Sequence, residues 1–169
     1  MKKLFITYII LSSLIQSQII GTWKLAPVAG ALKVGPGIDD GDWWMNSLED
    51  VENRACFFDD EYVFHADGTF ENIYGAQTWL ETWQGINAEA CGSPAWPHNG
   101  SNASTWEYDE SAQTITLSGV GSHLGLPKAI NGGELPHCGC EVPETRTYNV
   151  LSTGAGSMVA YIQSAGSGT

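Results

Sequence analysis

Hydrophobic and polar residues alternate most clearly across residues 59–75, where two short extended runs flank a turn. Tyr62 and Phe64 share one face of the first run, and Phe70 resumes the alternation in the second. A period of two predicts strands with one buried face. Asp67-Gly68 supplies residues that tolerate a positive φ, which a tight turn between twisted strands requires. The stretch therefore predicts a β-hairpin.

Similar patterns recur along the chain. Residues 19–25 predict a first strand, residues 104–118 a second hairpin and residues 145–163 a third. Leu124 to Ile130 is a short apolar piece of undetermined type. No helical period is strong enough for crossover connections, so the prediction is an all-β, up-and-down antiparallel barrel of about seven strands. The sequence then stops at residues 164–169 without a closing strand, which leaves open whether the barrel has its final strand.

Residues 26–53 are rich in glycine and proline and predict a long ordered loop with one helical turn near Ser47 to Val51. Asp39, Asp40 and Asp42 cluster around a glycine there and could supply oxygen ligands to calcium. The EF-hand spacing is incomplete, so a solvated acidic turn is the favoured interpretation and calcium stays open.

The chain begins with Lys2 and Lys3 followed by an apolar run too short to span a bilayer comfortably. Residues 1–18 are therefore predicted to be a signal peptide, and residues 19–169 one domain that is secreted or held at the cell surface. We expect no membrane insertion after signal cleavage. A formal net charge of −12 excludes nucleic acid as a partner, because phosphates need Lys and Arg.

A secreted chain with four cysteines favours disulfides. Of the three pairings we prefer Cys56–Cys91, with Cys138 and Cys140 either closing a tight ring or staying reduced. Those last two cysteines, with His137, could instead ligate zinc or copper, with His98 or His123 as a distant fourth ligand. The doubled spacing of a zinc site is absent, so we predict no metal and no cofactor.

The aromatic residues are the main functional lead. Sugar rings stack on indole faces, while carboxylates and amides bind their hydroxyls. The alternative role for a tryptophan in a barrel is packing, to which we assign Trp23 and Trp106. The candidate ligand-binding residues outside the clear strands are Trp43, Trp44, Trp79, Trp83 and Trp96, with Asp42, Glu81 and Gln84 beside them.

Several runs together resemble a known group. These runs are Gly21-x-Trp23, the stretch from Arg54 to Tyr62, Trp79-Leu80-Glu81-x-Trp83, and Leu124 to Ala129. They are similar to the lipocalin-like β-barrel modules of secreted Bacteroidota (flavobacterial) proteins, some of which also carry laminarinase-type glycoside hydrolase domains. The resemblance covers nearly the whole mature chain and implies a lipocalin-like barrel. The Glu-x-Asp-x-x-Glu motif of laminarinase-type enzymes is absent, so an accessory role is implied.

No Gly-x-Ser-x-Gly elbow or phosphate-binding glycine loop is present, and carboxylates are too common for any pair to stand out. We therefore predict a non-catalytic binding module and not an enzyme. The leading partner is a polysaccharide bound through loop tryptophans. The alternatives are a carrier of a small apolar ligand inside the barrel, and a structural or adhesive module that joins neighbouring domains or copies of itself through an open sheet edge.

Overall fold

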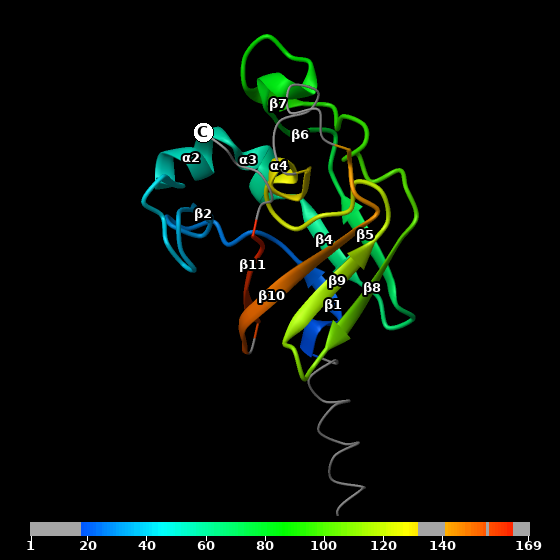
Figure 1. Cartoon of the computed structure of the whole chain (residues 1–169). Coiled ribbons are helices and arrows are strands. Elements are labelled where there is room, and N and C mark those ends of the chain that lie inside the picture. Colours follow the sequence, from blue (N-terminus) through cyan, green and yellow to red (C-terminus); the bar gives the residue numbers. More distant parts are fainter. Residues whose placement is uncertain (1–17, 132–140, 155, 164–169) are drawn as a thin grey trace, which may run out of the picture.

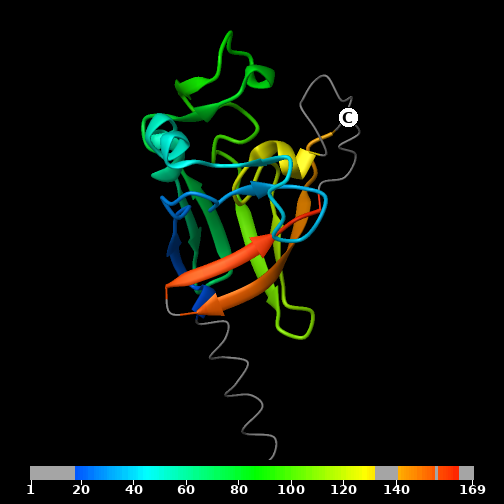
Figure 2. The same ribbon diagram turned by 90° about the vertical axis from the view of Figure 1, so that its left-hand side faces the viewer.

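The computed structural model describes residues 18–131, 141–154 and 156–163. Its centre is a seven-stranded antiparallel sheet in the order β1-β4-β5-β8-β9-β10-β11, curved into a half-barrel (Figures 1 and 2). Neighbouring strands follow chain order, and no ladder joins β1 to β11 among the described residues. This confirms the predicted all-β, up-and-down fold without a closing strand. The strands are β1 (Gly21–Trp23), β4 (Glu61–Phe64), β5 (Thr69–Ile73), β8 (Ser104–Asp109), β9 (Thr114–Ser118), β10 (Thr145–Gly154) and β11 (Ser157–Tyr161).

The predicted central hairpin is confirmed, with Phe64 opposite Phe70 in the β4–β5 ladder. Its turn differs from the expectation in one respect. Gly68 takes a positive φ of 86°, whereas Asp67 does not. Instead, the Asp67 carboxylate accepts a hydrogen bond from the Thr69 amide at 2.9 Å, so its role is to fix the turn through its side chain.

Among the described residues, two small hairpins and four short helical segments interrupt the strand succession. They gather mainly over one end of the half-barrel (Figure 1). Ser47 caps α2 in a reciprocal box with Asp50, which confirms the helical turn predicted there. The hairpins and helices are β2 (Lys33–Val34) with β3 (Trp44–Met45), β6 (Thr78–Leu80) with β7 (Ala90–Gly92), α2 (Leu48–Asn53), α3 (Ala55–Phe58), η1 (Thr82–Gln84) and α4 (Pro127–Asn131).

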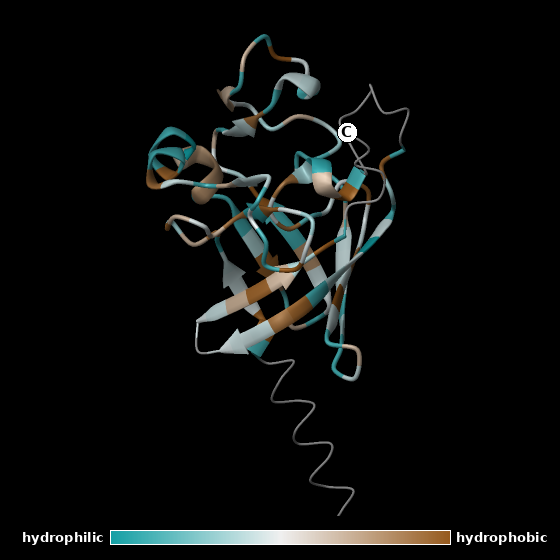
Figure 3. Cartoon of the chain, turned by 60° about the vertical axis from the view of Figure 1, so that its left-hand side comes forward, coloured by the Kyte–Doolittle hydropathy of each residue, from teal (hydrophilic) through white to brown (hydrophobic). Residues whose placement is uncertain are grey.

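Aromatic and aliphatic side chains from the inner face of the sheet make one core. Apolar and polar segments alternate along its strands (Figure 3). The Phe64 ring meets Phe70 and Trp106 edge-on, with centroids 5.0 and 5.2 Å away. Trp23 packs against this core from β1, so both tryptophans assigned to packing lie where expected. The buried members of the core are Ile19, Tyr62, Phe64, Phe70, Trp106, Ile115, Leu117, Ile130, Tyr148 and Val150.

A disulfide joins Cys56 on α3 to Cys91 on β7, which confirms the preferred pairing. The bond suits an oxidising, extracellular setting. Cys138 and Cys140 lie outside the described residues, as does nearly all of the predicted signal segment. Within the described ranges, the helices are all too short and too polar to cross a bilayer.

Arg54 connects the two small hairpins. Its guanidinium lies 5.3 Å from the ring centroid of Trp44 on β3 and 4.7 Å from that of Trp79 on β6. Carboxylate oxygens of Asp50 and Glu89 lie 3.8 and 3.7 Å from the same group. A planar cation between two indoles suits arginine and not lysine, whose charge has no flat face.

We expect Arg54→Ala to lower the free energy of unfolding by about 1–3 kcal/mol, because a largely buried cation–π contact and its packing are lost together. Arg54→Lys should recover only part of the loss. Lys24→Ala is the matched control, because it removes an exposed ion pair with Glu61 and should cost under about 0.5 kcal/mol. Urea denaturation followed by tryptophan fluorescence measures all three. Equal losses for Arg54→Ala and Lys24→Ala would contradict the proposed connection.

Candidate functional site

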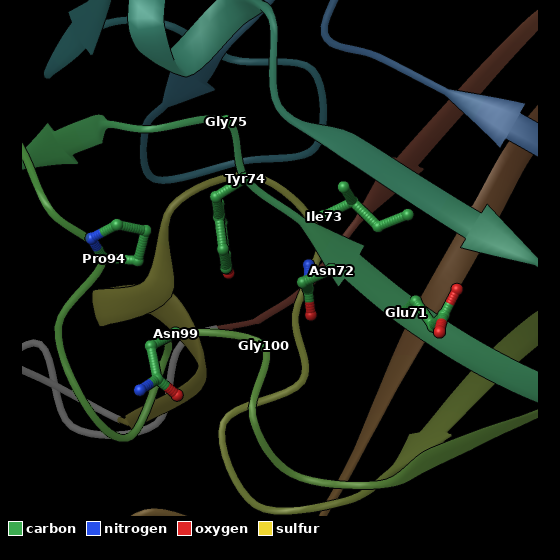
Figure 4. A pocket seen from close by; sticks show the side chains of 8 residues that line it. All are labelled: Glu71, Asn72, Ile73, Tyr74, Gly75, Pro94, Asn99 and Gly100. Carbon is green, nitrogen blue, oxygen red and sulfur yellow. The ribbon is translucent and has the colours of Figure 1, made fainter.

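A polar concavity of about 340 Å³ opens where the end of β5 faces the loop that joins β7 to β8 (residues 93–103, the 93–103 loop). Figure 4 shows Asn72 and Tyr74 pointing into the space between the two segments. We call this concavity the Tyr74 pocket. Its lining includes Glu71, Asn72 and Tyr74 on the strand side and Pro94, Asn99 and Gly100 on the loop side.

The 93–103 loop is held by close backbone approaches that only glycine permits. A Cβ at Gly100 would lie 2.4 Å from the carbonyl oxygen of Asn72, and one at Gly121 would lie 1.9 Å from that of Pro97. Both glycines also have positive φ angles, of 72° and 86°. Three segments that are distant in sequence therefore cross here almost backbone to backbone.

His123 is the centre of this crossing. Asn72 clamps its backbone, donating from Nδ2 to the His123 carbonyl at 2.8 Å and accepting from the His123 amide at 3.2 Å. The Tyr74 ring stacks on the imidazole with centroids 6.3 Å apart. His123 Nδ1 donates to the Gly121 carbonyl at 2.9 Å, which leaves Nε2 as the unprotonated nitrogen. The pocket floor thus depends on a neutral imidazole.

His98 is buried beside it, with the two imidazole centroids 5.6 Å apart. Its Nε2 donates to Asn131 Oδ1 at 3.1 Å, while its Nδ1 has no partner. Burial lowers the pKa of His98 to about 4 and that of His123 to about 3, and the neighbouring imidazole adds to the shift at His123. Both rings are therefore uncharged at neutral pH.

Trp96 stands at the tip of the same loop. The His98 amide donates to the Ala95 carbonyl at 3.0 Å, which closes a four-residue turn around the cis Trp96–Pro97 bond. The Trp96 side chain is 71% exposed, the highest value among the exposed large hydrophobic residues. A buried histidine thus anchors the turn that displays an exposed indole between Pro94 and Asn99.

The other predicted tryptophans divide into two groups. Trp43 is 63% exposed on the β2–β3 hairpin, so two of the five indoles face solvent. Trp44 and Trp79 are half-buried around Arg54, and Trp83 is buried at 7% exposure. The structure therefore does not bring the five indoles together on one surface.

The polar partners predicted beside these tryptophans serve mainly local packing. Glu81 is buried and accepts hydrogen bonds from Trp83 Nε1 at 2.6 Å and Lys128 Nζ at 2.7 Å. Gln84 accepts from the Glu81 amide. Asp42 is exposed, and its amide donates to Asp40 Oδ1. Of these three side chains, none lines the Tyr74 pocket.

Sequence reasoning missed Asn72 and Tyr74, which line the pocket, and considered His98 and His123, which pack behind Tyr74, only as a distant metal ligand. It also missed Asp60, whose buried carboxylate accepts from Thr78 at 2.6 Å and whose pKa burial raises to about 7. The two glycines at the crossing were the one available signal, since a glycine outside an obvious turn can mark a close backbone approach.

The acidic turn shows no assembled cation site. Asp39 pairs with Lys33 at 2.8 Å, and within the described ranges no three His, Cys, Asp or Glu residues are grouped as metal ligands would be. His137, Cys138 and Cys140 lie outside those ranges.

We expect Gly121→Ala to destabilise the protein by about 3 kcal/mol or more, because the added Cβ meets the Pro97 carbonyl as well as an unfavourable φ. Gly85→Ala is the matched control. Gly85 has a φ of 93° and no atom within 4 Å of the position that an added methyl would take, so only about 1 kcal/mol of backbone strain applies. Thermal and urea unfolding compare the two. A cost at Gly121 no larger than at Gly85 would show that the crossing is loosely packed.

Comparisons with known proteins add no identification: no family model, no curated protein and no solved structure matches the chain.

Proposed function

We propose that this protein is a secreted, non-catalytic module that binds neutral polysaccharide at the Tyr74 pocket. The observation that carries the proposal is Trp96, a largely exposed indole that does not itself line the pocket but lies on the same loop as Pro94, Asn99 and Gly100, which do. A sugar ring has apolar C–H faces, which stack on an indole, and hydroxyls around its edge, which bind hydrogen-bonding groups.

The polar groups of the pocket suit hydroxyl ligands. The Glu71 carboxylate can accept hydrogen bonds from hydroxyls. Its Oε2 lies 2.9 Å from His65 Nε2. Asn99 Oδ1 already accepts from Ser101, so its amide nitrogen is the group available to donate to a ligand. Glu71 and Asn99 line the concavity from opposite walls, one on the strand side and one on the loop side.

Charge favours neutral over anionic glycans. The residues that line the pocket include the Glu71 carboxylate and no lysine or arginine, and the whole chain carries a formal charge of −12. A uronate or sulfate group would bring a second negative charge to a site with no cation to receive it.

The interior supports surface binding over carriage of an apolar ligand. A lipocalin-type carrier needs an open lumen, and here Phe64, Phe70 and Trp106 fill the concave side of the sheet with mutual edge-to-face contacts. Two concavities of the described residues, the Tyr74 pocket and one beside Trp23 and Gly156, are open to solvent and not enclosed.

We expect Trp96→Ala to weaken binding to a neutral polysaccharide about tenfold or more, because the stacking face is lost. Folding stability should change by under about 0.5 kcal/mol, since the side chain is mostly exposed. Affinity gel electrophoresis with laminarin, xyloglucan and galactomannan measures the neutral class, and alginate and pectate measure the anionic class.

Trp43→Ala is the control, because it removes a similarly exposed indole from a different hairpin. Its affinity should stay within about twofold of the wild type. Unchanged migration of the wild-type protein in every gel would refute glycan binding. A loss confined to Trp43→Ala would place the ligand on the β2–β3 hairpin instead.

The open sheet supports a second candidate, assembly through the unpaired edges. Strands β1 and β11 each have one neighbour in the sheet, which leaves a row of backbone groups on each edge without a strand partner among the described residues. Val159 on β11 is 46% exposed. Such edges accept a strand from another chain, and nothing on β11 carries a charge that would repel one.

If assembly uses these edges, the oligomer should strengthen with salt, because screening weakens the repulsion between acidic copies. Val159→Lys should weaken it at least about tenfold, since charged side chains protect sheet edges. Thr105→Lys places the same charge on the exposed face of the internal strand β8 and should have little effect. Light scattering after size-exclusion chromatography, at low and high salt, measures the mass. A monomer under all conditions would exclude self-assembly.

A further inference from the structure

We propose that the imidazoles of His98 and His123 form an acid-sensitive latch that holds the 93–103 loop against the sheet, so that their protonation opens the Tyr74 pocket and releases its ligand. The release of a ligand rests on the proposed function. The latch itself is a property of the loop and can be measured without a ligand.

Each of the two imidazoles holds a different part of the loop and the pocket in place. His98 comes from the loop and is buried between Trp83, at 5.9 Å between centroids, Asn131 and His123. His123 supports Tyr74 by stacking, and its backbone is clamped by Asn72, so it holds two residues of the pocket. Withdrawal of His98 would therefore remove the anchor of the Trp96 turn and one support of the pocket floor together.

A second proton on either buried imidazole would lack a hydrogen-bond partner at normal distance. On His98 it would sit at Nδ1, which is buried without a partner. On His123 it would sit at Nε2, which lies 3.5 Å from the Tyr74 hydroxyl, a long distance for a hydrogen bond. The two charged rings would also repel one another across 5.6 Å in a buried environment. An opened loop offers both rings water instead.

The direction of the effect follows from linkage. Both histidines have folded pKa values below the ordinary 6.5, about 4 for His98 and about 3 for His123. The closed state is therefore fully favoured above pH 6.5 and loses stability relative to the open state as pH falls below that value. At pH 5, each histidine exposed on opening raises the open population about thirtyfold.

The other titratable groups around the pair do not act in the same direction as the histidines. Burial raises the pKa of Tyr62, Tyr74 and Tyr148, so all three stay neutral. Burial also raises the pKa of Asp60, beside Tyr62, to about 7, so Asp60 gains a proton between pH 7 and pH 5, which removes a buried charge and favours the closed state. The charged groups on the remaining packed elements are Glu81 with Lys128, beyond Trp83, and Arg146, whose Nε donates to the Ile130 carbonyl.

The test compares hydrogen exchange of the 93–103 loop between pH 7 and pH 5 in the full chain, corrected for the intrinsic pH dependence of exchange. The double variant His98→Gln, His123→Asn keeps a donor where each ring now donates, to Asn131 and to the Gly121 carbonyl, and cannot be charged. We expect wild-type protection in this loop to fall at least about tenfold more than in the variant. Laminarin and xyloglucan affinity should fall in parallel in the wild type only.

His65→Gln is the control, because His65 is exposed and pairs with Glu71 at the pocket. If His65→Gln abolishes the pH effect, or if the double variant retains it, the latch is wrong. If the double variant does not fold, hydrogen exchange is measured on His98→Gln alone, and the imidazole chemical shifts of the wild-type protein are followed against pH. Titration of both folded imidazoles near pH 6.5 overturns the proposal. Failure of every glycan to bind at pH 7 would refute the proposed function and leave the exchange result to judge the latch.

Discussion

The structure around the candidate site depends on one constraint, the close crossing of three distant segments at the end of the half-barrel. Gly100 and Gly121 let the backbones approach, and Asn72 joins β5 to His123 across 51 positions of sequence. A crossing this tight excludes water, so the imidazoles inside it are held neutral. The same exclusion gives the loop above a fixed shape, and that shape displays Trp96. Packing, ionisation and the geometry of the site therefore have a common cause.

The half-barrel was largely predictable because three of its six strand pairs are local. β4–β5, β8–β9 and β10–β11 are hairpins between chain neighbours, and each reveals itself by alternation around a turn. The small ladders β2–β3 and β6–β7 were not predicted, since two or three residues are too few to show a period. The Cys56–Cys91 bond was the preferred pairing because it ties the entry of the central hairpin to the later loop, and it links two regions that the strand pattern leaves unconnected.

The candidate site was predictable only in part, because it depends on contacts that local pattern does not contain. Tryptophan content indicated an aromatic surface, but the exposure of each ring is decided by its partner. Trp44 and Trp79 pack on Arg54, and Trp83 donates a hydrogen bond to Glu81, whereas Trp96 lies exposed in a turn that a buried histidine two residues away closes. Nothing in the spacing of these residues distinguishes the packed rings from the displayed one.

An exposed indole at the end of a rigid loop is unfavourable on a surface that only needs to be soluble. The chain is strongly acidic, so charge already provides solubility, and aspartate or serine at position 96 would serve it as well. The loop instead holds that position with buried polar groups, and two of their atoms, His98 Nδ1 and Asn131 Nδ2, have no hydrogen-bond partner. That destabilising arrangement is reasonable where the indole must be presented in one orientation, because a fixed ring loses little freedom when it stacks on a sugar. Sheet-edge assembly makes no such demand on Trp96.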